Sequence, residues 1–239
     1  MPRLPIDIAT EDTLSFLLRE SLPCKLLEVG CGHGQVAVEL VRAGYDVTAI
    51  DASDEAVAAT RQLGVSATHI DFLEYDAGPF DVIFFGRSLH HIHPLGKTVE
   101  RARRMLKPGG KLLADDFAAE LIDLDNVVWT AKSKRQLGSF HIDDQHDEED
   151  MPPEELLKHW KIHHFEKHHV ATSTEMLVPL AETFKLVRTE RVAYMYRYVV
   201  DKLKPDPAAT DLASELLQTE RNLIAAGELV AIGLRIVAS

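Results

Sequence analysis

The chain has 239 residues, of which 46% are hydrophobic and 27% charged, so it can bury a sizeable core as one domain. It carries 38 acidic and 26 basic side chains, and this net charge of −12 argues against nucleic acid as the main partner. No uncharged apolar run reaches the roughly 18 residues of a membrane span, and Asp7 interrupts any signal-peptide core. Cys24 and Cys31 are too few for a disulfide framework, so we expect free thiols and a cytoplasmic protein.

Short apolar runs alternate with helical patterns from residue 25 to residue 117. This alternation predicts repeated βα units and a parallel sheet with helices on both faces. We expect strands at 25–29, 46–50, 67–70, 80–85 and 111–117, and helices at 11–20, 35–43, 54–63 and 98–106. Gly44 and Gly64 follow two of these helices, where a left-handed residue commonly ends a helix.

After residue 117 the alternation stops, and about sixty residues follow that are rich in charge and histidine, including the acidic stretch 143–150. Two prolines at 152–153 predict a helix through about residue 169, and Thr172 with Glu175 has the capping-box spacing for a helix through residue 183. Tyrosines at 194, 196 and 198 alternate as in a strand over 192–200. A helix near 207–226 and a strand near 230–237 complete the pattern.

The most informative segment is an apolar strand that leads into Gly30, Gly32 and Gly34 and then into a helix. A loop of alternate glycines lets a ligand approach the backbone, although a tight strand-to-helix turn alone is the alternative. The dinucleotide fingerprint requires a third glycine where Gln35 stands. This substitution counts against a nicotinamide-dependent dehydrogenase.

Acidic residues close the next two strands at the same predicted edge of the sheet. Asp51 can accept both hydroxyls of a ribose, or it can simply cap the helix that begins near residue 54. Asp71 offers an acceptor for an exocyclic amine, and Phe72 offers a ring beside a base. Together with the glycines, these residues predict a nucleoside pocket.

These segments resemble the successive motifs of class I S-adenosylmethionine-dependent methyltransferases, at 27–34, Asp51, Asp71-Phe72, 80–83, 88–92 and 106–111. The resemblance covers about residues 25–117 and implies S-adenosylmethionine as the cofactor. It implies roles for Glu28 with the backbone of Gly30 and Gly32 at the methionyl part, Asp51 at the ribose, Asp71 and Phe72 at the adenine, and the backbone of Gly86 and Arg87 at the amino-acid end. Ala52 and Cys31 also count among the cofactor-binding residues, with Cys31 as a small packing residue and not a nucleophile.

The expected fold is therefore α/β: a Rossmann-like, doubly wound, mostly parallel sheet of seven strands with helices on both faces and a helical lid insertion. We expect one methyltransferase domain over 1–239. Its parts are an N-terminal helical cover (1–24), a cofactor-binding core (25–117), a lid or substrate insertion (118–182), and C-terminal strands and a helix that complete the sheet (183–239).

Methyl transfer to a hydroxyl or phenol benefits from a base, because the attacking oxygen loses its proton as the new bond forms. His90 follows the fourth strand, and Asp116 ends the fifth, its expected neighbour. We therefore expect a His90–Asp116 dyad with His90 as candidate general base. The alternative is that His90 and His91 pack beneath the next helix and bond to backbone.

Seven of the twelve histidines lie between residues 141 and 169. His159 with His163, and His164 with His168, are spaced so that each pair can share a helix face and chelate a metal. A third ligand and a zinc-protease motif are both missing, so we assign no metal and favour solvated histidines or residues that line the acceptor pocket. Residues 118–182 are expected to close over the cofactor and exclude water.

The sequence thus predicts an enzyme that transfers a methyl group from S-adenosylmethionine to an oxygen or nitrogen of a small-molecule acceptor by in-line displacement. No nucleic-acid or membrane partner is expected. The alternative function is a non-catalytic nucleoside-binding or metal-responsive regulatory protein.

Overall fold

The computed structural model describes residues 3–140 and 151–239, and the chain divides into two compact units. The helical unit comprises Met1–Glu11, Phe117–Val170 and Arg191–Gly233, and the sheet unit comprises Asp12–Asp116, Ala171–Glu190 and Leu234–Ser239. The acidic stretch 143–150, together with His141 and His146, lies outside the described residues.

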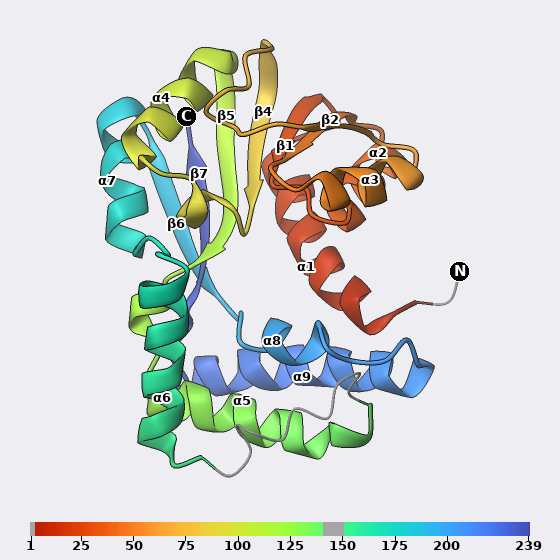
Figure 1. The fold of residues 1–239 in the computed structure, drawn as a ribbon, viewed down its shortest axis with the longest axis vertical. Helices are drawn as coiled ribbons and strands as arrows, with labels where there is room; N and C mark the ends of the chain where they lie inside the picture. Colours follow the sequence, from red (N-terminus) through yellow and green to blue (C-terminus); the bar gives the residue numbers. More distant parts are fainter. Residues whose placement is uncertain (1–2, 141–150) are drawn as a thin grey trace. The chain divides into compact units, whose positions relative to one another are not determined.

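A seven-stranded sheet has the order β3-β2-β1-β4-β5-β7-β6 (Figure 1). The four pairs that join β3, β2, β1, β4 and β5 are all parallel. The strands are β1 (Lys25–Val29), β2 (Asp46–Asp51), β3 (Ser66–His69), β4 (Phe80–Gly86), β5 (Leu106–Phe117), β6 (Val187–Val192) and β7 (Gly233–Ala238). The doubly wound α/β fold predicted from the sequence is confirmed.

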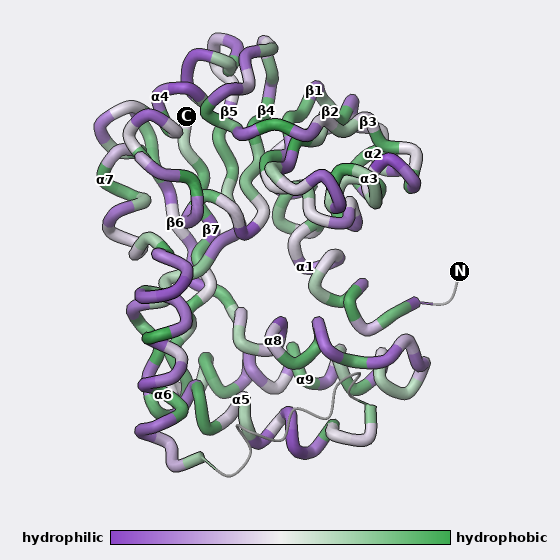
Figure 2. The backbone as a smooth tube through the Cα atoms, in the orientation of Figure 1, coloured by the Kyte–Doolittle hydropathy of each residue, from purple (hydrophilic) through white to green (hydrophobic). Residues whose placement is uncertain are grey.

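Consecutive residues of the central strands supply opposite faces of the sheet, since side chains alternate along a strand. Leu27, Ile83 and Leu112 belong to one buried cluster. Their neighbours Leu26, Val82 and Leu113 belong to another. Figure 2 shows hydrophobic residues along β4 and β5, as expected for strands covered on both sides.

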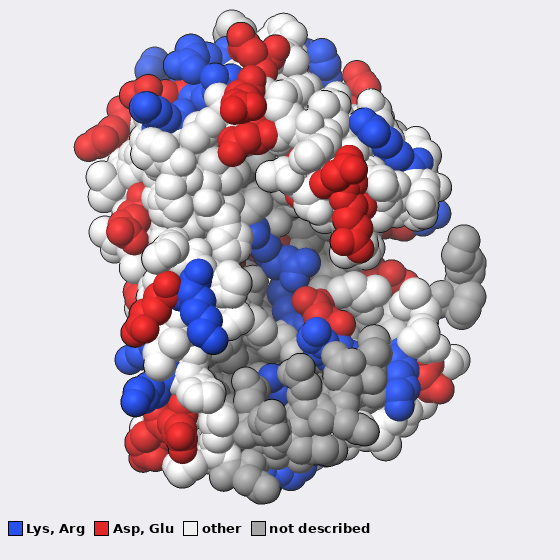
Figure 3. Space-filling view, viewed as in Figure 1, with Lys and Arg blue, Asp and Glu red and all other residues white. Residues whose placement is uncertain are grey.

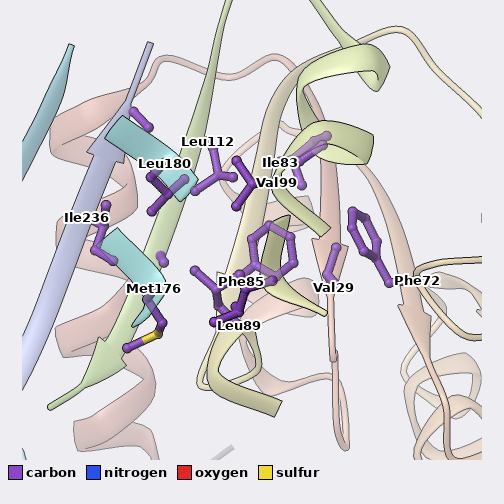
Figure 4. Packing of buried hydrophobic residues seen from close by; sticks show 14 of the residues in the cluster. Val29, Phe72, Ile83, Phe85, Leu89, Val99, Leu112, Met176, Leu180 and Ile236 are labelled. Carbon is purple, nitrogen blue, oxygen red and sulfur yellow. The ribbon is translucent and has the colours of Figure 1, made fainter. Parts of the chain in front are cut away.

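Helices cover both faces. The first cluster includes residues of α4 (Leu95–Met105) and α7 (Ser173–Thr183), with Val99, Met176 and Leu180 packed around Phe85 (Figure 4). The second includes residues from the C-terminal half of α1 (Pro5–Glu20), from α2 (Gln35–Arg42) and from α3 (Asp54–Gln62). The carboxyl ends of β1, β2, β4 and β5 are thereby fixed by burial on two sides.

Several helix ends follow the local signals in the sequence. The capping box is present, because the Thr172 hydroxyl accepts from the Glu175 amide and the Glu175 carboxylate accepts from the Thr172 amide. Gly44 and Gly64 have positive φ angles of 93° and 83° after α2 and α3. Helix α1 begins six residues earlier than the predicted start at residue 11, with Pro5 as its first residue.

The helical unit contains α5 (Leu124–Gln136), α6 (Pro153–Lys161), the π-helix η4 (Ile162–Lys167), α8 (Arg197–Val200) and α9 (Pro207–Ala226). Short 3-10 turns are η1 (Leu89–His91) in the sheet unit, and η2 (Ala119–Leu121) and η3 (Gly138–Phe140) in the helical unit. The buried residues of α9 recur at the spacing of one helix face, at Ala209, Ala213, Leu217 and Glu220, which fits a helix buried on one side. Two buried clusters, around Tyr196 and around Phe117, stabilise this unit.

The prediction of one regular helix from residue 153 to about 169 is wrong in its second half. The chain widens into a π-helix at Ile162, and the amide of His168 donates to the carbonyl of His163, five residues earlier. Because a π-turn shifts the facing residue by one position, His163 lies over His168 with ring centroids 4.4 Å apart. The expected pairing of His164 with His168 on one α-helical face does not form.

The predicted strand over 192–200 is also wrong beyond Val192. The carboxylate of Glu220, on α9, accepts hydrogen bonds from the amides of Tyr194, Met195 and Tyr196 at 2.7 to 2.9 Å. Amides bound to a side chain cannot donate to a neighbouring strand. The tyrosine segment therefore leaves the sheet and turns into α8, although its alternation is typical of a strand.

The predicted insertion is divided between the two units. Residues 118–170 belong to the helical unit, whereas α7 packs on the sheet through Met176 and Leu180. Closure of a lid over the cofactor stays a prediction.

Within the described residues, no helix is both long and apolar enough to cross a bilayer. Figure 3 shows acidic and basic side chains spread over the visible face.

Candidate functional site

The glycine loop joins β1 to α2 in the sheet unit. Gly30, Gly32 and Gly34 have φ angles of 75°, 51° and 81°, which a residue with a Cβ adopts only at a cost. Gly34 is the N-cap of α2 and supplies no side-chain cap. The three glycines therefore make the turn itself possible.

The surroundings of these glycines differ. A Cβ on Gly30 would stand 2.5 Å from the Cβ of Ser88, and one on Gly34 would meet Thr60 at 2.8 to 3.0 Å, so both positions bring segments into close contact. A Cβ on Gly32 would meet no atom of residues 3–140 or 151–239 within 4 Å. Space beside the loop therefore remains at Gly32, where a ligand can approach the backbone.

Three loop amides already have acceptors within the protein. The amides of Gly30 and Cys31 donate to the carbonyl of Ile50 at 2.9 and 3.1 Å. The amide of Gly32 donates to Oδ2 of Asp51 at 2.9 Å. A ligand that contacts Gly30, Cys31 or Gly32 without displacing these bonds can donate to their carbonyl oxygens.

Glu28 lies at the end of β1 and is 2% exposed. Its Oε2 atom is buried and has no hydrogen-bond partner among the residues that the structure describes. Burial raises the pKa of Glu28 from its ordinary value of 4.5 to about 8, and the negative charge of Asp51 adds to the rise. Near neutral pH this carboxyl is thus mainly protonated, and it offers both an O–H donor and an acceptor.

Asp51 ends β2, and each of its carboxylate oxygens accepts a hydrogen bond from a backbone amide. Oδ2 accepts from the amide of Gly32 and Oδ1 from the amide of Ser53, both at 2.9 Å. The N-cap of α3 is Ser53, whose hydroxyl accepts from the Ala56 amide, so Asp51 does not perform the capping role. A carboxylate has about four acceptor positions, and Asp51 therefore keeps capacity for hydroxyl donors. Ala52 is exposed beside it.

The residues after β3 point in different directions. Asp71 is exposed, and its Oδ1 accepts from the Leu73 amide at 2.7 Å. The ring of Phe72 is 3% exposed and meets Phe85 edge-to-face, with centroids 5.2 Å apart (Figure 4). Phe72 thus packs in the core below this edge, and its role beside an adenine stays a prediction.

The end of β4 is strained. Arg87 has a φ of 56°, which is uncommon for a residue other than glycine and often marks functional segments. Its amide donates to the carbonyl of Asp115 on β5 at 2.9 Å. Before it, Gly86 leaves room for the ring of Phe84, which a Cβ would approach to 3.0 Å.

His90 and Asp116 meet as expected from their strand ends. Nδ1 of His90 and Oδ1 of Asp116 are 2.5 Å apart, and both side chains are buried. The carbonyl of His90 accepts from the Ala171 amide at 3.0 Å, which fixes the 3-10 turn that carries the histidine. With Nδ1 facing the carboxylate, Nε2 is the ring nitrogen directed to other partners.

A buried ion cluster next to the dyad was missed by the sequence reasoning. Arg235 of β7 contacts Oδ1 of Asp115 at 3.2 Å and Oδ2 of Asp12 at 2.8 Å. The hydroxyl of Thr13 donates to the other oxygen of Asp115 at 2.6 Å. The signal was a lone arginine in an otherwise apolar final strand, because a charge in a buried strand needs a partner.

The two remaining sequence-based expectations concern sulfur and metals. Cys31 is 6% exposed, and burial raises the pKa of its thiol to about 11, so the expectation of a packing residue fits its surroundings. Within residues 3–140 and 151–239, no group of three His, Cys, Asp or Glu side chains is placed to hold a metal ion.

Comparisons with known proteins found a matching family model and several relatives. The family model described as a methyltransferase domain matches residues 7–178, more than two thirds of the chain. The chain is 36% identical over 94 residues to a ubiquinone biosynthesis O-methyltransferase of Caulobacter vibrioides, a match that covers 36% of the chain and 37% of that protein. It is 31% identical over 117 residues to the 27-O-demethylrifamycin SV methyltransferase of Amycolatopsis mediterranei, covering 44% of the chain and 43% of that enzyme. The chain thus spans less than half the length of both relatives.

A solved structure shares the fold over nearly the whole chain. The plantazolicin methyltransferase BpumL, in complex with a monoazolic desmethylPZN analog and SAH, aligns with a TM-score of 0.54 and 17% identity. The alignment covers 96% of this chain and 81% of that one. At this identity the likeness concerns the fold alone.

Proposed function

This chain belongs to the family of S-adenosylmethionine-dependent methyltransferases, and on that premise we propose that it methylates an oxygen or nitrogen of a small molecule. The observation that carries the proposal is the His90–Asp116 contact of 2.5 Å at the carboxyl ends of adjacent strands, on the edge that holds the glycine loop. The similarity to O-methyltransferases supports an oxygen acceptor.

The residues at this edge fit the cofactor. A methionyl ammonium is a hydrogen-bond donor, and the carboxyl of Glu28 and the carbonyls of the glycine loop can accept from it. We assign the remaining contacts as follows: the ribose to Asp51 and Ala52, the adenine to Asp71 and Phe72, and the amino-acid end also to the backbone of Gly86 and Arg87, with Cys31 packing beneath the loop.

When bound, S-adenosylmethionine would supply an activated methyl group, with the positively charged sulfur as the leaving group for in-line transfer. Asp116 holds the Nδ1–H of His90, so that Nε2 carries the lone pair. His90 takes the proton of an acceptor hydroxyl as the new C–O bond forms. For an amine acceptor the nitrogen lone pair suffices, and His90 then serves to orient the acceptor.

Binding of the cofactor is tested by calorimetry with S-adenosylmethionine and S-adenosylhomocysteine. Asp51→Asn should weaken both at least tenfold, because an amide replaces one acceptor oxygen of the carboxylate with a donor. Asp54→Asn is the matched control, since Asp54 is exposed on the first turn of α3, and its affinity should match the native value. Absence of binding heat with the native protein would overturn the proposed function.

The base is tested by transfer of a labelled methyl group to a panel of phenols and amines. His90→Gln should lower kcat for a phenol by a factor of about 100 or more while the affinity for S-adenosylmethionine stays native. His91→Gln is the control, because His91 is the adjacent, exposed histidine. A native rate of phenol methylation by His90→Gln would remove His90 from the mechanism.

A further inference from the structure

A cavity of about 300 Å³ lies within the helical unit, between α5, the α6–η4 segment, Met195 and α8. All of its lining residues belong to this unit. The volume is at the lower end of the range typical of small-molecule sites, so it suits a molecule of one or two rings. None of the cofactor-edge residues described above lines it.

One wall of the cavity is aromatic and held in place by hydrogen bonds. The indole of Trp160 stacks on the ring of His164, with centroids 3.8 Å apart, and meets Tyr198 edge-on at 4.8 Å. His164 is buried, with Nδ1 2.9 Å from the carbonyl of Trp160 and Nε2 3.1 Å from the hydroxyl of Tyr198. Because both ring nitrogens have partners, this wall is a preorganised flat surface against which a planar ligand can pack.

The wall is completed by apolar side chains, and its charged groups are two lysines. Val127, Leu156 and Met195 supply aliphatic surface. Lys134 and Lys167 line the cavity, together with three histidines, whereas no Asp or Glu is among its described lining residues. In a chain with a net charge of −12, two lysines on an aromatic pocket with no acidic side chain among its described lining residues indicate a preference for a negatively charged group.

We propose that this pocket binds a small aromatic carboxylate. The ring packs on the Trp160–His164 wall, and the carboxylate lies toward Lys134 and Lys167. The inference does not depend on the proposed methyl transfer, because every residue that carries it belongs to the helical unit and binding requires no cofactor.

Tryptophan fluorescence tests the pocket directly. The chain has two tryptophans, and Trp129 does not line the cavity, so Trp129→Phe leaves Trp160 as the only indole reporter. Titration of this full-length variant with 2-naphthoate, without S-adenosylmethionine, should give a saturable change in emission. The neutral isostere 2-naphthamide and the aliphatic octanoate should each bind at least tenfold more weakly, because one lacks the charge and the other the flat ring.

Lysine variants in the Trp129→Phe background test which side chains bind the carboxylate of the ligand. Lys134→Met and Lys167→Met should each weaken 2-naphthoate at least fivefold and leave 2-naphthamide unchanged. Lys132→Met is the control, because Lys132 is exposed on the same helix as Lys134 and does not line the cavity. Far-UV circular dichroism checks that each variant is folded.

Three outcomes would overturn the inference: no saturable response to 2-naphthoate, equal affinity for 2-naphthoate and 2-naphthamide, or native affinity in both lysine variants. A protein that methylates nothing but binds 2-naphthoate with this selectivity would refute the proposed function and leave the pocket intact. The two proposals therefore fail independently.

Discussion

Glu28→Gln should make the protein more stable at alkaline pH. The native carboxyl is fully buried with an unpartnered Oε2, and its pKa rises from 4.5 in the unfolded chain to about 8 in the folded protein. Because the folded state holds this proton more firmly, the stabilising contribution is complete below pH 4.5 and is lost as the pH rises through 8. A rise of this size corresponds to about 5 kcal/mol, of which about 4 kcal/mol falls between pH 5 and pH 9.

Urea unfolding at a series of pH values measures the effect. Far-UV circular dichroism is the signal, because both tryptophans lie in the helical unit and their fluorescence would not report on the sheet unit that contains Glu28. Glutamine has the same shape and no titrating group, so subtracting the two stability curves isolates Glu28 from the other carboxyl groups, including the buried Glu220. From pH 5 to pH 9, the free energy of unfolding of the Glu28→Gln variant should increase by several kcal/mol relative to that of the native protein. Parallel curves over this range would refute the assignment of a raised pKa.

Other substitutions test further contacts. Arg235→Met leaves the buried carboxylates of Asp12 and Asp115 without their cation and should lower the free energy of unfolding by about 3 to 5 kcal/mol, whereas Arg104→Met on the surface should change it by less than about 0.5 kcal/mol; equal effects would contradict the ion cluster. Gly64→Ala, with open space, should cost about 1 kcal/mol in urea unfolding, and Gly34→Ala should cost clearly more because its Cβ also meets Thr60; equal losses would contradict the packing argument. In a Cys24→Ser variant at pH 8, the buried Cys31 thiol, with its pKa near 11, should react with a thiol reagent only after denaturation, and fast native reaction would contradict its burial.

The parts of the fold that the sequence predicted are those set by neighbouring residues. The turn from β1 to α2 requires positive φ angles at 30, 32 and 34. Three glycines within five residues indicate this requirement in the sequence. The capping box at Thr172 is equally local. The His90–Asp116 contact needed one additional step, namely that β4 and β5 are parallel neighbours, and this follows from the regular βα order.

The parts that were mispredicted depend on residues far apart in the chain. The tyrosine segment has the alternation of a strand, but Glu220, about 25 residues later, takes three of its amides. The π-helix at 162–167 has an ordinary helical sequence, and its extra residue shifts which histidines face one another. No pattern within either segment carries that information.

The correct and the incorrect predictions have the same physical origin. A hydrophobic alternation specifies only which face of a segment is buried, while the partner of each backbone amide is decided by competition among all acceptors that reach it. At the carboxyl edge of the sheet the competitors are few, because the strand ends and the glycine turns fix the backbone, and motif reasoning therefore identified His90 and Asp116, which lie together. In the helical unit a buried carboxylate and an extra residue in a helix changed the outcome. The chemistry of the aromatic cavity follows from the resulting packing, and it is absent from any single stretch of the sequence.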